Sequence, residues 1–191
     1  MDLNPSLDLS VVVPVHNERD NVAPLVREIE AALAPLALAF EIVYVDDHSR
    51  DDTLAQLRAL KAAHPRLRVL HHRTQSGQST ALRTGIKAAR GRWIATLDGD
   101  GQNDPADIPK LLAARDAGSP KIKLYAGWRV QRRDSGSKRW ASRIANAIRS
   151  RLLRDETPDT GCGIKLFERA VFLDLPYFDH MHRYLPALVQ R

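Results

Sequence analysis

Two carboxylates separated by glycine form the chemically most suggestive pattern in the sequence, Asp98-Gly99-Asp100-Gly101-Gln102. On an extended loop, alternate positions direct the Asp98 and Asp100 side chains toward one point, and the glycines leave the backbone room to turn. Mg²⁺ and Mn²⁺ are commonly held by one or two carboxylates together with the oxygens of a bound diphosphate, and Gln102 could add a third oxygen. The alternative is an ordinary turn, since Asp and Gly are frequent turn residues.

A second acidic pair, Asp46-Asp47, is followed within six residues by Ser49, Asp51 and Thr53. Paired carboxylates at the end of a strand can accept hydrogen bonds from a base or a ribose, as acidic residues do in dinucleotide-binding folds. The alternative is a helix cap, for which Ser49 and Asp51 are suited. Both interpretations can hold together, and the pattern favours nucleotide contacts at Asp46 and Asp47.

Six of the seven histidines show no metal-ligand spacing on a helix face, and we interpret them as solvated or loop side chains without a chemical role. They are His16, His48, His71, His72, His180 and His182.

Short apolar, β-branched runs that predict buried strands precede these acidic segments. They span residues 9–15, 41–46, 67–70 and 93–97. Apolar residues at helical spacing predict helices over residues 19–33, 52–63 and 79–89. This alternation predicts an α/β fold with a mostly parallel sheet sandwiched between helices, in which ligands bind at the carboxyl ends of the strands.

Three of the predicted strands end in carboxylates or in a segment that contains one, namely Glu18, Asp46-Asp47 and Asp98-Asp100. Their repulsion in one crevice would be costly without a cation or hydrogen-bond donors there. A bound divalent metal ion is the simplest resolution.

Composition limits the class of protein. With 191 residues, 43% of them hydrophobic, the chain can form one globular domain, and we expect a single domain over 1–191. The single Cys162 cannot close an internal disulfide, which favours a reducing, cytoplasmic setting. The longest apolar stretch is too short to cross a bilayer, and the N-terminus does not resemble a secretory signal.

The net charge of +6 is concentrated in one region, because eleven Lys and Arg against one acid lie between Lys121 and Arg154. Within it, the stripe Trp140, Ile144, Ile148 and Leu152 among arginines predicts a basic amphipathic helix over 137–154. Such a helix either packs its stripe on the core or lies on an anionic membrane surface.

Several motifs, taken together, resemble the inverting family 2 glycosyltransferases of GT-A fold, in the branch of dolichyl-phosphate mannosyltransferase and undecaprenyl-phosphate sugar transferases. The motifs are Pro14 with Asn17-Glu18, Asp46-Asp47-x-Ser49-x-x-Asp52-Thr53, Gly77-Gln78-Ser79, Asp98-x-Asp100-x-Gln102-x-x-Pro105 and Gly127-x-Arg129-x-x-Arg132. The similarity runs from Ser10 to Arg191.

The resemblance implies that a sugar moves from a nucleotide-diphosphate sugar to a polyprenyl phosphate, with inversion and with Mg²⁺ or Mn²⁺, at the inner face of the cell membrane. It assigns the nucleotide sugar to Pro14, Glu18, Asp46, Asp47, Asp98, Arg129 and Arg132, and the metal to Asp98, Asp100 and Gln102. Asp100, Arg129 and Asp159 are the candidate catalytic residues, of which Asp159 could act as a base or at the acceptor site.

Members of this branch continue beyond the segment at 183–187, so we expect this chain to be truncated at its C-terminus. A family 2 enzyme that glycosylates a saccharide or another hydroxyl acceptor is the alternative, and it would need a positioned base. A non-enzymatic basic module that binds nucleic acid is the rival from another class. No zinc finger, RNP aromatic pair or Gly-x-x-Gly clamp supports that rival, so we expect no nucleic-acid partner. The sequence assigns no oligomeric state.

Overall fold

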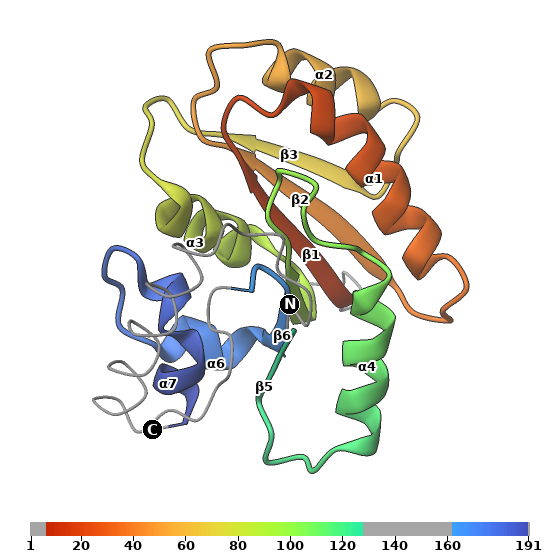
Figure 1. Cartoon of the computed structure of the whole chain (residues 1–191), viewed down its shortest axis with the longest axis vertical. Helices are drawn as coiled ribbons and strands as arrows, with labels where there is room; N and C mark the ends of the chain where they lie inside the picture. The colour runs from red at the N-terminus through yellow and green to blue at the C-terminus, as the bar shows by residue number, and fades with distance from the viewer. Residues whose placement is uncertain (1–6, 128–161, 191) are drawn as a thin grey trace, which may run out of the picture.

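The computed structural model describes residues 7–127 and 162–190, in which strands and helices alternate up to the fourth strand (Figure 1). The first part contains β1 (Leu7–Val15), α1 (Arg19–Leu33), β2 (Phe40–Asp46), α2 (Thr53–Leu60), β3 (Leu67–His71), α3 (Gln78–Ala88), β4 (Gly91–Thr96), α4 (Asp107–Ala117) and β5 (Leu124–Ala126). The second contains β6 (Lys165–Glu168), α6 (Arg169–Asp174), the 3₁₀ helix η1 (Met181–Arg183) and α7 (Leu185–Val189).

The strands form one six-stranded sheet in the order β3-β2-β1-β4-β6-β5. The first four strands pair in parallel, whereas β6 runs antiparallel to both β4 and β5. The predicted strands and helices correspond to β1 to β4 and α1 to α3, and the predicted mostly parallel α/β sheet is confirmed. The two short strands β5 and β6, and the helices α4, α6 and α7, were not predicted.

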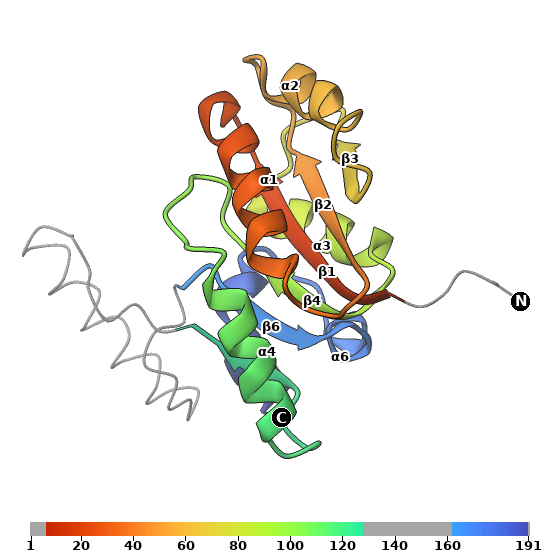
Figure 2. The same ribbon diagram turned by 90° about the vertical axis from the view of Figure 1, so that its right-hand side faces the viewer.

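Helices cover both faces of the sheet. Figure 1 shows α1, α2 and α4 on one side and α3, α6 and α7 on the other. In Figure 2, α1 lies above α4 on the face of the sheet that both helices cover. Each face has its own apolar core, because alternate residues of a strand point to opposite sides: Val11 and Val13 pack beneath α1, while Val12 packs beneath α3.

Gly85 brings α3 close to the sheet. A Cβ atom at this position would lie 2.5 Å from Val12 Cγ1 and 3.0 Å from Val45 Cγ2. Because α3 begins at the carboxyl ends of the strands, this close approach also sets where Gln78 and Ser79 lie.

Glu41 ties the opposite end of the sheet together. This carboxylate is 1% exposed and accepts hydrogen bonds from Ser10 Oγ at 2.8 Å, Arg68 Nη1 at 2.7 Å and the Arg90 backbone N–H at 2.6 Å. Burial would raise its pKa, but these hydrogen bonds outweigh burial and hold the pKa of Glu41 below its ordinary value. The ionised carboxylate therefore links β1, β2, β3 and the start of β4.

Several predictions from the sequence lie outside the described residues: the basic helix over 137–154, Arg129, Arg132 and Asp159. Within 7–127 and 162–190, no helix combines the length and the apolar character that crossing a membrane requires.

We predict that Gly85→Ala destabilises the fold. Alanine is the better helix former by about 1 kcal/mol, but overpacking a core costs about 1–3 kcal/mol, so urea unfolding should show a net loss near 1 kcal/mol. The double variant with Val12→Ala, which removes the clashing methyl groups, is the control. Gly85→Ala should cost less in that background, and a stabilising effect in the wild-type background would contradict the packing argument.

Candidate functional site

Acidic side chains from three strand ends meet in one cavity of about 340 Å³. Four acids line it: Glu18 follows β1, Asp47 follows β2, and Asp98 and Asp100 follow β4. The remaining lining residues are Pro14, Val15, His16, Gln75, Gly77, Gln78, Ala81 and Gly99. The structure thus brings together most of the acidic residues that the sequence singled out.

Asp98 is held in a fixed position. Its Oδ1 accepts a hydrogen bond from Gln78 Nε2 at 2.8 Å, and its backbone N–H donates to Asn103 Oδ1 at 3.3 Å. Gly163 lies so close that a Cβ atom on it would overlap the Asp98 carboxylate. The sequence did not assign a role to Gln78, Asn103 or Gly163.

Asp100 lies on the turn that follows. Gly101 has a φ of +70°, in the left-handed region that glycine adopts readily, and the Gln102 backbone N–H then donates to Asp100 Oδ1 at 3.0 Å. Gln102 itself is exposed and lies outside the lining of the cavity. The segment therefore forms the turn that was the alternative interpretation, and it also directs both carboxylates into the cavity.

The donor set suits a hard divalent cation that takes further ligands from a substrate. Asp98 and Asp100 offer carboxylate oxygens to one cavity, which is the number of carboxylates that Mg²⁺ or Mn²⁺ uses beside phosphate oxygens. Among the residues that the structure describes, no three His, Cys, Asp or Glu side chains are grouped to enclose an ion by themselves. The metal assignment, including Gln102, stays a prediction.

Asp47 fastens the loop before α3. Its Oδ1 accepts hydrogen bonds from His72 at 2.7 Å and from the Ser76 N–H at 2.8 Å, and its Oδ2 accepts one from the Gly77 N–H at 2.7 Å. Burial acts to raise the pKa of Asp47, but these hydrogen bonds together outweigh it and hold that pKa below its ordinary value. An ionised Asp47 therefore stabilises the backbone that leads to Gln78.

Asp46 has no exposed surface and is not among the residues that line the cavity. The register of β2 and β3 places it opposite His71, whose Nδ1 is 2.8 Å from Asp46 Oδ2, and the Ser49 N–H donates to the same oxygen at 3.3 Å. Asp46 Oδ1 is one of two buried side-chain atoms without a hydrogen-bond partner among the described residues. The N-cap residue of α2 is Asp52, whose side chain makes no capping hydrogen bond, whereas Asp51, one residue earlier, accepts the Thr53 N–H at 3.0 Å.

The cavity's remaining predicted residues are Pro14, near the end of β1, and Glu18, at the start of α1. Pro14 is buried and lines the wall, while Glu18 Oε2 accepts a hydrogen bond from Asn21 Nδ2 at 2.6 Å. Both line the cavity, and their assignment to a bound nucleotide stays a prediction.

The interpretation of the histidines as solvated or loop side chains holds only in part for His72, which does lie in the loop after β3 but is not solvated, and it is wrong for His182, which lies in η1. His72 is nearly buried and bridges Asp47 to Thr84 Oγ1, which is 2.9 Å from its Nε2. His182 lies 2.6 Å from Ser79 Oγ, and desolvation together with the charge of Arg183 lowers its pKa to about 4. The sequence carries no signal for the contact between His72 and Asp47, because that contact depends on the register of β2 against β3.

The chain was compared with known proteins. Residues 10–175 match the family model described as glycosyl transferase family 2. A dodecaprenyl-phosphate galacturonate synthase of Rhizobium johnstonii is 37% identical over 186 residues, which cover 96% of this chain and 54% of that protein. An undecaprenyl-phosphate 4-deoxy-4-formamido-L-arabinose transferase of Pseudomonas savastanoi is 37% identical over 165 residues, covering 85% and 48%. The chain thus spans about half the length of these relatives.

Solved structures of glycosyltransferases share the fold. Glucosyl-3-phosphoglycerate synthase from Mycobacterium tuberculosis superposes with a TM-score of 0.68 at 21% identity, covering 90% of this chain and 60% of that one. A mannosyltransferase from Pyrobaculum calidifontis, solved with GDP-Man and Mn²⁺, gives a TM-score of 0.61 at 22% identity and covers 93% and 50%. The predicted GT-A fold is confirmed by these neighbours.

We predict that Asp100→Asn abolishes the gain in UDP or GDP affinity that Mn²⁺ provides, because it removes a charged oxygen ligand from the metal. Calorimetry with and without Mn²⁺ measures this gain. Asp104→Asn is the matched control, since Asp104 is exposed and lies outside the cavity lining. Equal metal-dependent affinity in the two variants would refute the assignment of Asp100.

We predict that His72→Leu lowers the free energy of unfolding at pH 7 by about 1–3 kcal/mol, because the nearly buried Asp47 carboxylate loses a donor. A depressed pKa stabilises the fold above the ordinary Asp pKa of about 3.9, and that contribution is lost as the pH falls through the folded-state pKa. The difference in the free energy of unfolding between wild type and His72→Leu should therefore become smaller below about pH 4.

Urea unfolding of both proteins at pH 7 and below about pH 4 measures this difference in the free energy of unfolding. His180→Asn serves as the control, because His180 is exposed, makes no hydrogen bond to Asp47, and has a φ of +62° that asparagine also adopts. If His72→Leu unfolds like His180→Asn, His72 does not support Asp47.

Proposed function

The chain belongs to glycosyltransferase family 2, and from this we propose that it transfers a sugar from a nucleotide-diphosphate sugar to a polyprenyl phosphate. The observation that carries the proposal is the cavity in which Glu18, Asp47, Asp98 and Asp100 converge from three strand ends. Four acids in one cavity are suited to the hydroxyl groups of a nucleoside and to a cation, and unsuited to a bare anion.

The donor is assigned to this cavity. Pro14, Glu18 and Asp47 contact the nucleoside, with Asp46 supporting them through His71 and the loop at Ser49. Asp98 and Asp100 would hold Mg²⁺ or Mn²⁺, which would supply positive charge to stabilise a departing diphosphate. Neighbouring structures crystallised with Mn²⁺ and a nucleotide or nucleotide sugar support this choice of ion.

The acceptor is inferred from the relatives, whose names specify dodecaprenyl phosphate and undecaprenyl phosphate. A phosphate monoester is ionised near neutral pH, so one of its oxygens can attack the anomeric carbon without a strong general base. The new carbon–oxygen bond forms as the bond to the diphosphate breaks, and the electron pair leaves with the diphosphate. Attack from the face opposite the leaving group inverts the anomeric centre.

Further roles fall on residues outside the described part of the chain. We assign Arg129 and Arg132 to the phosphates, because a guanidinium offers a planar fork of donors to phosphate oxygens. Asp159 is a candidate for the acceptor site. The basic segment 137–154 would attract the protein to anionic lipid at the inner face of the cell membrane, where the acceptor resides.

We predict that the chain, supplied with Mn²⁺, undecaprenyl phosphate and a panel of UDP- and GDP-sugars, forms a lipid-linked sugar and releases the nucleoside diphosphate. Asp98→Asn should reduce the rate by about 100-fold or more, because stabilisation of the leaving group is lost. Chromatography of the lipid product and a coupled assay for the diphosphate measure both products. Asp104→Asn, outside the cavity, should retain the wild-type rate.

Two results would contradict the proposal. The first is sugar transfer to a saccharide with none to the lipid phosphate, which would favour the hydroxyl-acceptor alternative. The second is an unchanged rate in Asp98→Asn, which would remove the acidic cavity from the reaction.

A further inference from the structure

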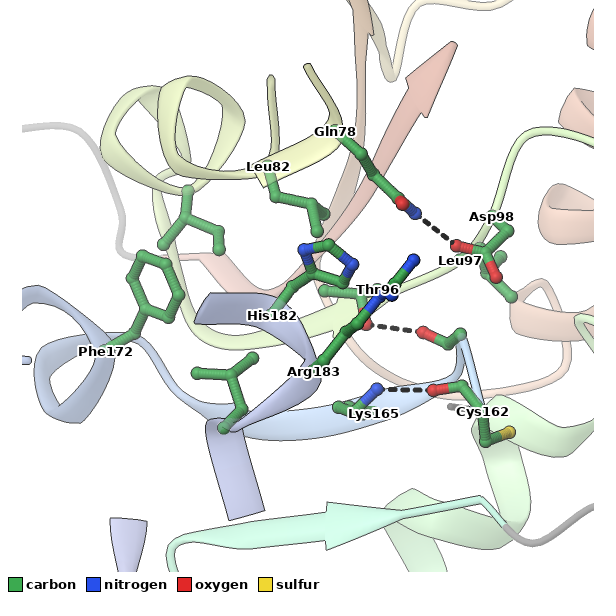
Figure 3. A pocket seen from close by; sticks show the side chains of 13 residues that line it. Gln78, Leu82, Thr96, Leu97, Asp98, Cys162, Lys165, Phe172, His182 and Arg183 are labelled. Carbon is green, nitrogen blue, oxygen red and sulfur yellow. Dashed lines mark hydrogen bonds between the residues drawn. The ribbon is translucent and has the colours of Figure 1, made fainter. Parts of the chain in front are cut away.

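A second cavity, of about 190 Å³, adjoins the acidic one. The two share Gln78 and Asp98, whose hydrogen bond forms part of the boundary between them (Figure 3). The other lining residues are Leu82, Ile86, Thr96, Leu97, Cys162, Gly163, Lys165, Phe172, His182, Arg183 and Leu185. This cavity therefore lies between the start of α3, the end of β4, β6 and η1.

The second cavity has the opposite electrostatic character. Lys165, His182 and Arg183 line it, and in the described part of the chain Asp98 is its one acidic lining residue. In Figure 3, His182 and Arg183 reach from η1 toward the Gln78–Asp98 pair. A cavity lined in this way is suited to an anion.

His182 offers a hydrogen bond as a neutral ring. Burial and the neighbouring cations lower its pKa to about 4, so the imidazole is uncharged near neutral pH. Its Nδ1 lies 2.6 Å from Ser79 Oγ. When the Ser79 hydroxyl donates to Nδ1, the proton of the ring resides on Nε2, which can then donate to a ligand.

The remaining wall of the cavity is apolar. Leu82 and Ile86 come from α3, while Phe172 and Leu185 come from α6 and α7, and all four are buried. The same C-terminal segment also carries most of the large apolar side chains that the described residues expose: Leu173, Tyr177, Phe178 and Tyr184. An anionic group attached to hydrocarbon matches this combination better than a free anion or a sugar does.

We propose that this cavity binds the phosphate head and the first isoprenyl carbons of the acceptor, with Arg183 and His182 on the phosphate and Leu82 and Phe172 on the hydrocarbon. The inference rests on the proposed function and adds the place of the acceptor to it. Because the two cavities share Asp98 and Gln78, a phosphate bound here adjoins the cavity assigned to the donor sugar. The cavity's volume admits the head of the lipid and leaves its long chain outside.

Direct binding of farnesyl phosphate to the 191-residue chain tests the inference. Arg183→Gln should weaken this binding by about tenfold or more, since a hydrogen bond between charged groups is lost. Arg58→Gln removes the same charge from the exposed face of α2 and should leave the affinity unchanged. UDP or GDP affinity in the presence of Mn²⁺, measured on each variant, should stay within about twofold of wild type and shows that the fold is intact.

The hydrocarbon part has its own variant. Leu82→Ala should weaken the binding of farnesyl phosphate several-fold and leave the binding of inorganic phosphate unchanged, because only the isoprenyl chain loses apolar contact. Farnesol, which lacks the phosphate, should bind much more weakly than farnesyl phosphate. Equal binding of inorganic and farnesyl phosphate would show an anion site without a lipid component, and would overturn the inference.

Two further outcomes separate this inference from the proposed function. If nucleotide and Mn²⁺ bind normally while Arg183→Gln and wild type bind farnesyl phosphate equally, the cavity is wrongly assigned and the donor assignment stands. If the wild-type chain binds no nucleoside diphosphate with Mn²⁺, the proposed function fails, whatever the farnesyl phosphate result.

Discussion

Burying carboxylates at the carboxyl ends of parallel strands is the constraint on which this structure depends. Asp46 has no exposed surface and Asp47 has only 4%, and an uncompensated charge at such a place would be strongly destabilising. Compensation comes from β3, which is in parallel register with β2, so that His71 and His72 follow beside the two acids. The backbone N–H groups of Ser76 and Gly77 complete the shell of Asp47. The loop into α3, and with it Gln78, is thereby fixed by the same interaction.

Much of the fold could be predicted because burial imposes a period on the sequence. Runs such as 9–15 are apolar on both faces of a covered strand, and α1 repeats its buried residues at helical spacing. The acids of the cavity could be found because they follow those runs directly. Elements with little periodic signal were not predicted from the sequence, because β6 has only four residues and α4 buries only Ile108 and Leu112.

The partners of the acids could not be predicted, for a physical reason. Which side chain stands opposite Asp46 depends on the register of β2 against β3, and the register depends on packing over the whole sheet. A histidine in a single sequence carries no mark of the strand beside it, so His72 could not be distinguished from a solvated loop residue. The contact of His182 with Ser79 joins residues 103 positions apart and depends on how the C-terminal segment folds back onto α3.

Charge is distributed unequally between the two cavities, and Asp98 lies where they meet. The acids Glu18, Asp47 and Asp100 lie on one side, and the cations Lys165 and Arg183 lie on the other beside the neutral His182. The electrostatic potentials of the two adjoining cavities differ in sign. The acidic cavity therefore favours a cation with its nucleotide, and the basic cavity favours an anion. Gln78 and Asp98 line both cavities, and the neutral amide of Gln78 donates a hydrogen bond to the Asp98 carboxylate at their boundary.

Because β6 comes late in the sequence, the acidic cavity and the basic cavity form at different times as the chain is synthesised. Residues 7–96 contain β1 to β4, and the parallel pairings among these strands involve no residue that is synthesised later. Thr96 must wait for a partner 67 residues further on, since its hydroxyl donates to the Gly163 carbonyl and its strand pairs with β6. Closing so long a loop is slow compared with local folding. A nascent chain therefore assembles the acidic half of the site first, and the basic half forms only when β6 and η1 have left the ribosome.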